Sequence, residues 1–360
     1  MGIGRFAFTP ILPMMQEDAG VSIAAGAWLA SANYLGYLLG ALSVMAVPIP
    51  AERAIRGGLV TIALATLGMG VSDRFAIWIV LRALAGIASA WVLICTSAWC
   101  LQRLEALRRP VLESTVFAGV GAGIALAGAA CLAFMRLHTT SARAWIVFGV
   151  GSLLVTLAIW PVFGAADRAT VSAGLRPRPE LAWNAEWLRL TLCYGAFGFG
   201  YIIPATFLPV MARQAITDPA VFGLSWPIFG AAAVASTLLA GRVRRLVTNR
   251  RLWIASHLVM ALGVALPVIR PGIAATMLAA LGVGGTFMVT TMVGMQEARE
   301  VAGARATALM AAMTSAFALG QIIGPIIASY LHGADGSFSA GLLIACGALL
   351  ASAGALGSSR

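Results

Sequence analysis

Eleven apolar stretches follow one another along this chain of 360 residues, and each is long enough to cross a lipid bilayer. A helix needs about 20 mainly apolar residues to span the hydrocarbon layer. Only 10% of the residues are charged, whereas a soluble domain carries about 25% charged residues. The sequence therefore predicts an all-α membrane protein with spans at 27–47, 54–72, 75–100, 112–135, 143–163, 187–211, 222–240, 252–269, 271–295, 306–331 and 338–357.

Two halves of the chain repeat each other at one fixed offset of 196 residues. The matched pairs are Gly2 with Gly198, Gly4 with Gly200, Leu12 with Leu208, Pro13 with Pro209, Met15 with Met211, Gly86 with Gly282 and Gly128 with Gly324. One offset shared by three helix pairs indicates a duplication read in the same direction. We therefore predict two parallel six-helix halves at 1–163 and 187–360, joined by a linker at 164–186.

The first helix of the first half is expected to be incomplete. The apolar run 2–15 would be about 21 Å long as a helix, which is too short to span the bilayer. Its counterpart begins near Trp187, eleven residues before Gly198. We interpret the chain as a twelve-helix protein whose first helix lacks its N-terminal part. A signal peptide is a poor alternative, because acidic Glu17 and Asp18 follow where small cleavage-site residues would stand.

The arginines predict the orientation of the chain in the membrane. All 24 basic residues are arginine. With the first fragment counted as a span, sixteen loop and terminal arginines fall on one side and five on the other. Cytoplasmic loops carry the excess of positive charge, so we expect both termini and the linker 164–186 in the cytoplasm.

Several classes of function are not expected from this sequence. The net charge of +11 is spread over short loops, so no nucleic-acid surface is predicted. The five cysteines lie in or beside apolar stretches without a CxxC pair or Cys/His cluster, which predicts buried thiols and no metal site. The sequence has no GxSxG, HExxH or Walker motif. An enzyme, a bound cofactor and ATP-driven transport by this chain alone are therefore not expected.

Three motifs resemble those of the major facilitator superfamily. Residues 82–86 (Arg-Ala-Leu-Ala-Gly), followed by Ser89 and Ala90, resemble the R-x-x-x-G motif of its fourth helix. Residues 320–325 (Gly-Gln-Ile-Ile-Gly-Pro) resemble the motif of small residues and proline in its eleventh helix. The opening 2–10 (Gly-Ile-Gly-Arg-Phe-Ala-Phe-Thr-Pro) is similar to the first helix of the YbfB/YjiJ-type branch, and the similarity extends over most of the chain. It implies a major-facilitator-type 12-helix fold, with two parallel six-helix halves, that carries a solute across a membrane.

Two loops depart from the pattern of that superfamily. The loop 48–58 contains Glu52 and Arg53 but lacks the usual aspartate, and the equivalent loop 241–245 is basic without an acid. These loops therefore do not support the superfamily's usual cytoplasmic ion-pair gate.

Arg5 is the most informative residue for function, because the repeat places it at the position of Tyr201, near the middle of the bilayer. An arginine there costs roughly 2.5–3.5 kcal/mol on insertion scales, so it should face a cavity or a partner. Anion binding in a central cavity and packing against backbone carbonyls both fit the sequence. Helix–helix hydrogen bonding is an equal alternative for each of the other polar candidates. The candidate cavity residues are Arg5, Asn33, Tyr34, Tyr37, Tyr201, Trp226 and Gln321.

Four residues are candidates for coupling or gating. For Arg82, the resemblance implies proton coupling or bracing of the helix bundle. Glu113 and Glu297 lie near cytoplasmic helix ends, where a solvated carboxylate is the simpler interpretation. His257 is a single histidine inside a span, where a packed neutral side chain is the simpler interpretation. Glycines four residues apart, Gly36 with Gly40, Gly119 with Gly123 and Gly320 with Gly324, predict close helix approach.

The function favoured by these observations is secondary active transport of a small solute by alternating access across a bacterial inner (plasma) membrane. An embedded arginine without a nearby acid favours an organic anion as substrate, and proton coupling is one option. The alternatives are efflux of amphipathic compounds and an inactive, truncated transporter. The expected partners are the small-molecule substrate and the lipid bilayer, and we expect a monomer.

Overall fold

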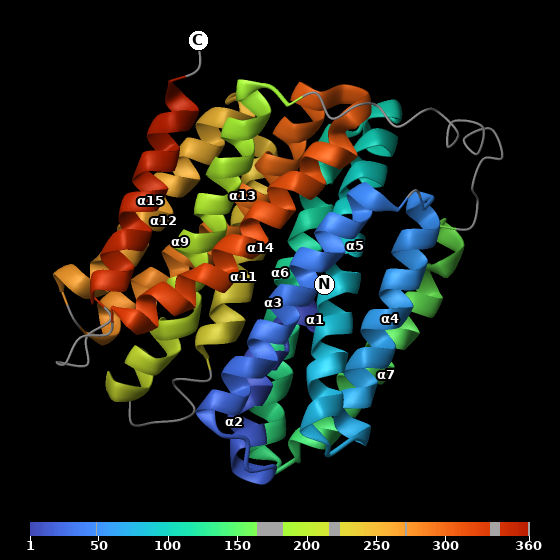
Figure 1. The fold of residues 1–360 in the computed structure, drawn as a ribbon, viewed down its shortest axis with the longest axis vertical. Coiled ribbons are helices and arrows are strands. Elements are labelled where there is room, and N and C mark those ends of the chain that lie inside the picture. The colour runs from blue at the N-terminus through green and yellow to red at the C-terminus, as the bar shows by residue number, and fades with distance from the viewer. Residues whose placement is uncertain (48, 164–182, 216–223, 271, 332–338, 359–360) are drawn as a thin grey trace.

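The computed structural model describes residues 1–47, 49–163, 183–215, 224–270, 272–331 and 339–358. All regular elements in these ranges are helices, and most of them are long and lie side by side (Figure 1). The all-α fold predicted from the apolar stretches is confirmed. The predicted linker 164–186 falls mostly outside the described residues.

The helices form two groups, which Figure 1 draws from blue to green and from yellow-green to red. The N group contains α1 (Gly2–Phe6), α2 (Phe8–Asp18), α3 (Ile23–Ala46), α4 (Ala51–Val71), α5 (Phe75–Ala106), η1 (Pro110–Leu112), α6 (Glu113–Arg136), α7 (Ser141–Ile159) and η2 (Trp160–Phe163). The C group contains α9 (Ala185–Ala215), α11 (Ser225–Val243), α12 (Asn249–Ile269), α13 (Ile273–Ala302), η4 (Gly303–Arg305), α14 (Ala306–Tyr330) and α15 (Ser339–Gly357).

The helices pair in the same way within each group. In the N group α1 packs on α6, α3 on α5 and α4 on α7; in the C group the equivalent helices pair as α9 on α14, α11 on α13 and α12 on α15. The most extensive contacts between the groups are those of α3 with α14 and of α11 with α6. When each helix is replaced by its equivalent in the other group, the first contact becomes the second. This pairing agrees with two parallel repeats. The predicted limits of the two halves, 1–163 and 187–360, stay a prediction.

Nine stretches within the described ranges are long and apolar enough to cross a membrane. They overlap ten of the eleven predicted spans, because the stretch Ile273–Ala328 takes in α13 and most of α14. The remaining predicted span, 187–211, falls in α9, which has 31 residues.

The first helix begins in the interior of the bundle. Gly2 packs on the middle of α6, where an added Cβ would lie 2.8 Å from the Cα atom of Gly123. The equivalent Gly198 packs on α14, where a Cβ would lie 2.3 Å from the carbonyl oxygen of Phe317. Only glycine allows this approach, and it places Arg5 midway along the bundle, as Figure 1 shows for the start of α1.

The predicted close approach of spaced glycines holds for most of the pairs. An added Cβ at Gly36 or Gly40 would lie 2.1 or 2.5 Å from a backbone oxygen of α5, and Gly320 packs equally closely on α9. The prediction is wrong for Gly119, which has nothing within 4 Å of an added Cβ. Its side of α6 is exposed, so only its partner Gly123 serves helix packing.

Candidate substrate cavity and gate

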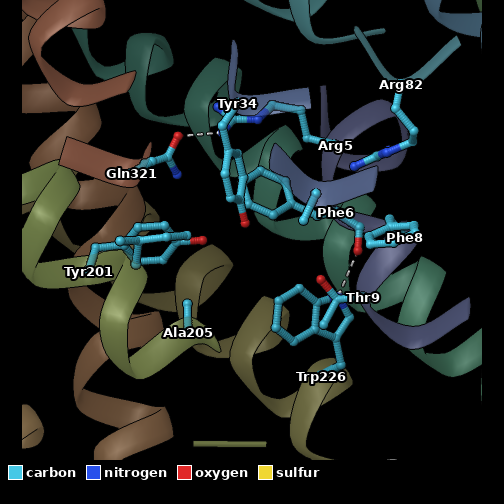
Figure 2. A pocket seen from close by; sticks show the side chains of 12 residues that line it. Arg5, Phe6, Phe8, Thr9, Tyr34, Arg82, Tyr201, Ala205, Trp226 and Gln321 are labelled. Carbon is cyan, nitrogen blue, oxygen red and sulfur yellow. Dashed lines mark hydrogen bonds between the residues drawn. The ribbon is translucent and has the colours of Figure 1, made fainter. Parts of the chain in front are cut away.

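A cavity lies between the two groups at the depth of α1 (Figure 2). The free volume in it is about 40 Å³, enough for a few water molecules but far below the roughly 300–1,000 Å³ of a typical small-molecule site. The cavity is therefore too small for an organic solute in this conformation. Its walls are Arg5, Phe6, Phe8, Thr9, Ala30, Tyr34 and Arg82 from the N group, and Tyr201, Ile202, Ala205, Trp226 and Gln321 from the C group.

Arg5 reaches across the cavity from α1 to the C group. Its Nη2 atom donates to Oε1 of Gln321 in α14 at 2.6 Å, and its guanidinium lies 3.8 Å from the centre of the Tyr37 ring. Only 5% of the residue is exposed. No Asp or Glu is among the described residues that line the cavity, and the positive charge of Arg5 meets the amide dipole of Gln321 and the rings of Phe6 and Tyr37.

Proline placement explains a second bond across the cavity. Pro10 has no N–H, so the carbonyl of Phe6, four residues earlier, cannot make its helical hydrogen bond. Trp226 Nε1 in α11 donates to this carbonyl at 3.2 Å. The same effect interrupts the first helix at Ala7, between α1 and α2. A break in the N group therefore supplies an acceptor to the C group (Figure 2).

Arg82 lies on the N-group side of the cavity and is held there by backbone. Its Nη1 atom donates to the carbonyl of Gly4 at 3.2 Å, its Nε atom to that of Leu29 at 3.5 Å, and its guanidinium lies 4.5 Å from the Phe8 ring centre. These contacts join α5 to the first helix and to α3. They fit the bracing role, while the coupling role of Arg82 stays a prediction.

The other predicted cavity residues separate into two sets. Tyr34, Tyr201 and Trp226 line the cavity, with Tyr201 stacked on Phe287 at a ring distance of 4.5 Å. Asn33 and Tyr37 do not line it. Asn33 is buried and donates to the carbonyl of Arg82 at 2.9 Å, which is the helix–helix bonding that the sequence left open. Tyr37 lies behind the cavity wall, and the guanidinium of Arg5 packs on its ring.

The arginine-rich end of the bundle carries a cluster that joins the two groups. Glu113, at the start of α6, accepts from Arg244 Nη1 at 2.6 Å and from Gln296 Nε2 at 2.7 Å. The Glu113 side chain is 7% exposed. We call Glu113, Arg244 and Gln296 the clamp, because its first residue belongs to the N group and the other two to the C group. Nearby, Arg299 pairs with Glu105, another contact between the groups.

The remaining coupling candidates lie inside the C group. Glu297 accepts from Arg250 Nε at 2.6 Å, and Arg250 also pairs with Glu186 of α9. His257 Nε2 accepts from Trp253 Nε1 at 2.9 Å, so the proton of a neutral ring is on Nδ1. His257 is fully buried and is not among the cavity residues. This placement agrees with the packed neutral side chain that the sequence favoured.

Sequence reasoning did not single out Phe6, Thr9, Arg244 or Gln296. A signal existed for Phe6, because a proline four residues later frees a carbonyl in any helix. A signal also existed for Arg244, because the basic loop 241–245 without its own acid needs an acid from elsewhere. Gln296 had none, since a glutamine inside a helix does not reveal which helix it faces.

Two groups of helices that pair in the same way and enclose a cavity at mid-depth define this chain as a membrane transporter of the major facilitator type. The solved structures agree with that fold: a crystal structure of the human organic anion transporter MFSD10 (TETRAN) is similar with a TM-score of 0.72 and 14% identity, over 97% of this chain and 89% of the other. No curated protein sequence matches the chain.

The family itself is shown by a sequence comparison. The model of the family described as "Uncharacterised MFS-type transporter YbfB" matches residues 1–356, and the chain belongs to this family. Both the family and the fold are those of membrane-spanning transporters.

Proposed function

We propose that the protein is a secondary active transporter that moves a small organic anion by alternating access. The single observation that carries this proposal is Arg5, a buried cation that faces a cavity between the two groups without a carboxylate among the described lining residues. A buried charge without a counter-ion is costly, and an anionic solute would neutralise it. The name of the human structural neighbour, an organic anion transporter, is in line with this choice.

Two features support alternating access. The cavity is too small for a solute in this conformation, and the clamp closes the arginine-rich end by bonds between the groups. The excess of loop arginines at that end supports the proposal that it faces the cytoplasm of a bacterial inner membrane, with both termini inside. The protein would act as a monomer, with protons as the proposed coupling ion.

Counterflow in proteoliposomes tests the anion proposal. Vesicles loaded with an unlabelled organic anion are given the labelled anion outside, and its accumulation is followed. Arg5→Ala is expected to abolish the accumulation, and Arg5→Lys to leave a reduced rate, because a lysine keeps the charge but loses the planar fork. Arg74→Ala is the matched control, since Arg74 is an exposed arginine at the start of α5. Anion counterflow with wild-type kinetics in Arg5→Ala would overturn the proposal.

The aromatic lining favours a second candidate, efflux of amphipathic compounds. Phe6, Phe8, Tyr34, Tyr201 and Trp226 all border the cavity and would suit a flat apolar solute. The two arginines of the cavity wall, Arg5 and Arg82, would repel a cationic solute. Transport of an anionic dye, compared with transport of a cationic dye in inverted vesicles, therefore distinguishes the two candidates. Folded protein that moves neither dye nor any anion tested would favour the inactive transporter.

A further inference from the structure

Two adjacent nitrogen donors of Arg5 differ in their hydrogen bonding. Its Nη2 atom is bonded to Gln321 Oε1, while its Nε atom is buried and has no hydrogen-bond partner in the described part of the chain. Nε–H and the adjacent Nη2–H lie on the same edge of a guanidinium and point in parallel. A carboxylate fills such an edge with both of its oxygens, whereas an amide has one oxygen and fills only half of it.

The Tyr37 ring covers one face of the guanidinium and lies 3.8 Å from the Arg5 Cζ atom. The N–H donors lie in the guanidinium plane, so a hydrogen-bonding ligand approaches Arg5 at an edge. Gln321 reaches Nη2, one of the two donors of that edge, from the C-group side of the cavity, as Figure 2 shows. An anion therefore competes with Gln321 for the same donor.

We propose that Gln321 is a stand-in for the substrate: its amide oxygen holds one half of the Arg5 edge in the empty transporter, and the planar carboxylate of an organic anion displaces it. This inference rests on the proposed anion transport and names a monocarboxylate with an apolar or aromatic remainder as the substrate class. The carboxylate takes Arg5 Nε and Nη2 together. The remainder lies among Phe6, Tyr201 and Trp226, which line the cavity beside Arg5.

Displacement of Gln321 also has a consequence for the two groups. The bond from Arg5 to Gln321 joins α1 of the N group to α14 of the C group, 316 residues apart in sequence. When the carboxylate binds Arg5, the bond between Arg5 and Gln321 breaks and Arg5 donates to the substrate instead. Substrate binding is thereby tied to release of a contact between the groups.

The test compares two substitutions of Gln321 that differ in charge. Purified full-length protein in detergent is titrated with benzoate and hexanoate, and with benzamide and hexanamide as neutral counterparts, while the melting temperature and the dissociation constant are measured. Gln321→Glu places a permanent carboxylate at the Arg5 edge. It is expected to raise the melting temperature without ligand and to weaken carboxylate binding by about tenfold or more. Gln321→Leu removes the competitor, so binding is retained or tightened while the ligand-free melting temperature falls.

Gln102→Glu is the control for added charge, because Gln102 is exposed at the far end of α5. Equal benzoate affinity in Gln321→Glu and wild type would overturn the stand-in role and leave anion transport intact. Loss of binding in Gln321→Leu as complete as in Gln321→Glu would also overturn it, because Gln321 would then be a ligand and not a competitor. If wild type binds neither carboxylate, the monocarboxylate class is overturned, and the counterflow assay with other organic anions still decides the anion proposal.

Discussion

Neutralising Glu113 should open the arginine-rich end of the bundle. Glu113 is the acid of the clamp and accepts two hydrogen bonds from the C group, at 2.6 Å from Arg244 and 2.7 Å from Gln296. The two partners of the ion pair are shielded from water, with 7% and 22% of their side chains exposed, so solvent screens the pair only partly. In Glu113→Gln the side chain keeps its shape and one neutral hydrogen bond, but it loses the charge that attracts Arg244.

The size of the effect follows from these contacts. A hydrogen bond to a charged group contributes about 1.5–3 kcal/mol, and a neutral one about 1 kcal/mol. With each charged bond taken at the low end of its range, exchanging two of them for one neutral bond removes about 2 kcal/mol from the closed form. This loss shifts the ratio of closed to open molecules about thirtyfold. By comparison, the Arg299–Glu105 pair has an acid that is 69% exposed, so its loss should shift the ratio far less.

Cysteine labelling measures this shift. Ser114 is buried beside Gly241 of the C group, where an added Cβ on the glycine would lie 2.3 Å from Ser114 Oγ. A cysteine at position 114, in a chain without its native cysteines, is labelled by a maleimide only when the groups separate. Glu113→Gln should therefore raise the labelling rate about thirtyfold, in proportion to the open fraction. Exchanging the charges, with Glu113→Arg and Arg244→Glu together, should restore slow labelling.

Glu297→Gln is the matched control. It also removes the acid of a partly buried ion pair, but its partner Arg250 lies in the same group. Faster labelling to the same extent in Glu297→Gln would mean that general loosening of the protein, and not the clamp, controls access. An unchanged rate in Glu113→Gln would refute the reasoning directly.

Three further changes test the packing around the cavity. Trp226→Phe should lower the free energy of unfolding by about 1–2 kcal/mol, because the carbonyl of Phe6 loses its donor. In a Pro10→Ala background this loss should be smaller, because an N–H is restored to that carbonyl. A double-mutant cycle of melting curves would reveal the difference. Gly36→Leu should prevent stable folding, measured by size-exclusion chromatography, whereas Gly119→Leu should be tolerated, because only the first Cβ meets backbone. Arg82→Lys should lower the melting temperature, since one ammonium cannot replace the contacts with Gly4, Leu29 and Phe8; an unchanged value would show that these contacts add no stability.

Much of the architecture could be predicted from the sequence because its signals are local. Hydropathy marks each span within a window of about 20 residues, and the 196-residue offset pairs equivalent helices without any knowledge of their contacts. The same offset placed Arg5 at the level of Tyr201, and both residues line the cavity. A charge in an apolar segment is a local signal too, because its insertion cost demands a partner whatever the fold.

The identity of each partner was decided only by the tertiary structure. Arg5 meets Gln321 across 316 residues and Glu113 meets Gln296 across 183, and both bonds connect one group to the other. Apolar residues are spread over the whole circumference of most of these helices, so hydropathy does not tell which face of a helix meets which neighbour. That choice depends on close backbone approach at Gly2, Gly36 and Gly198, and on how the two groups pack once all helices are in place. The sequence therefore determined that a buried cation exists in this protein, and packing decided what it binds.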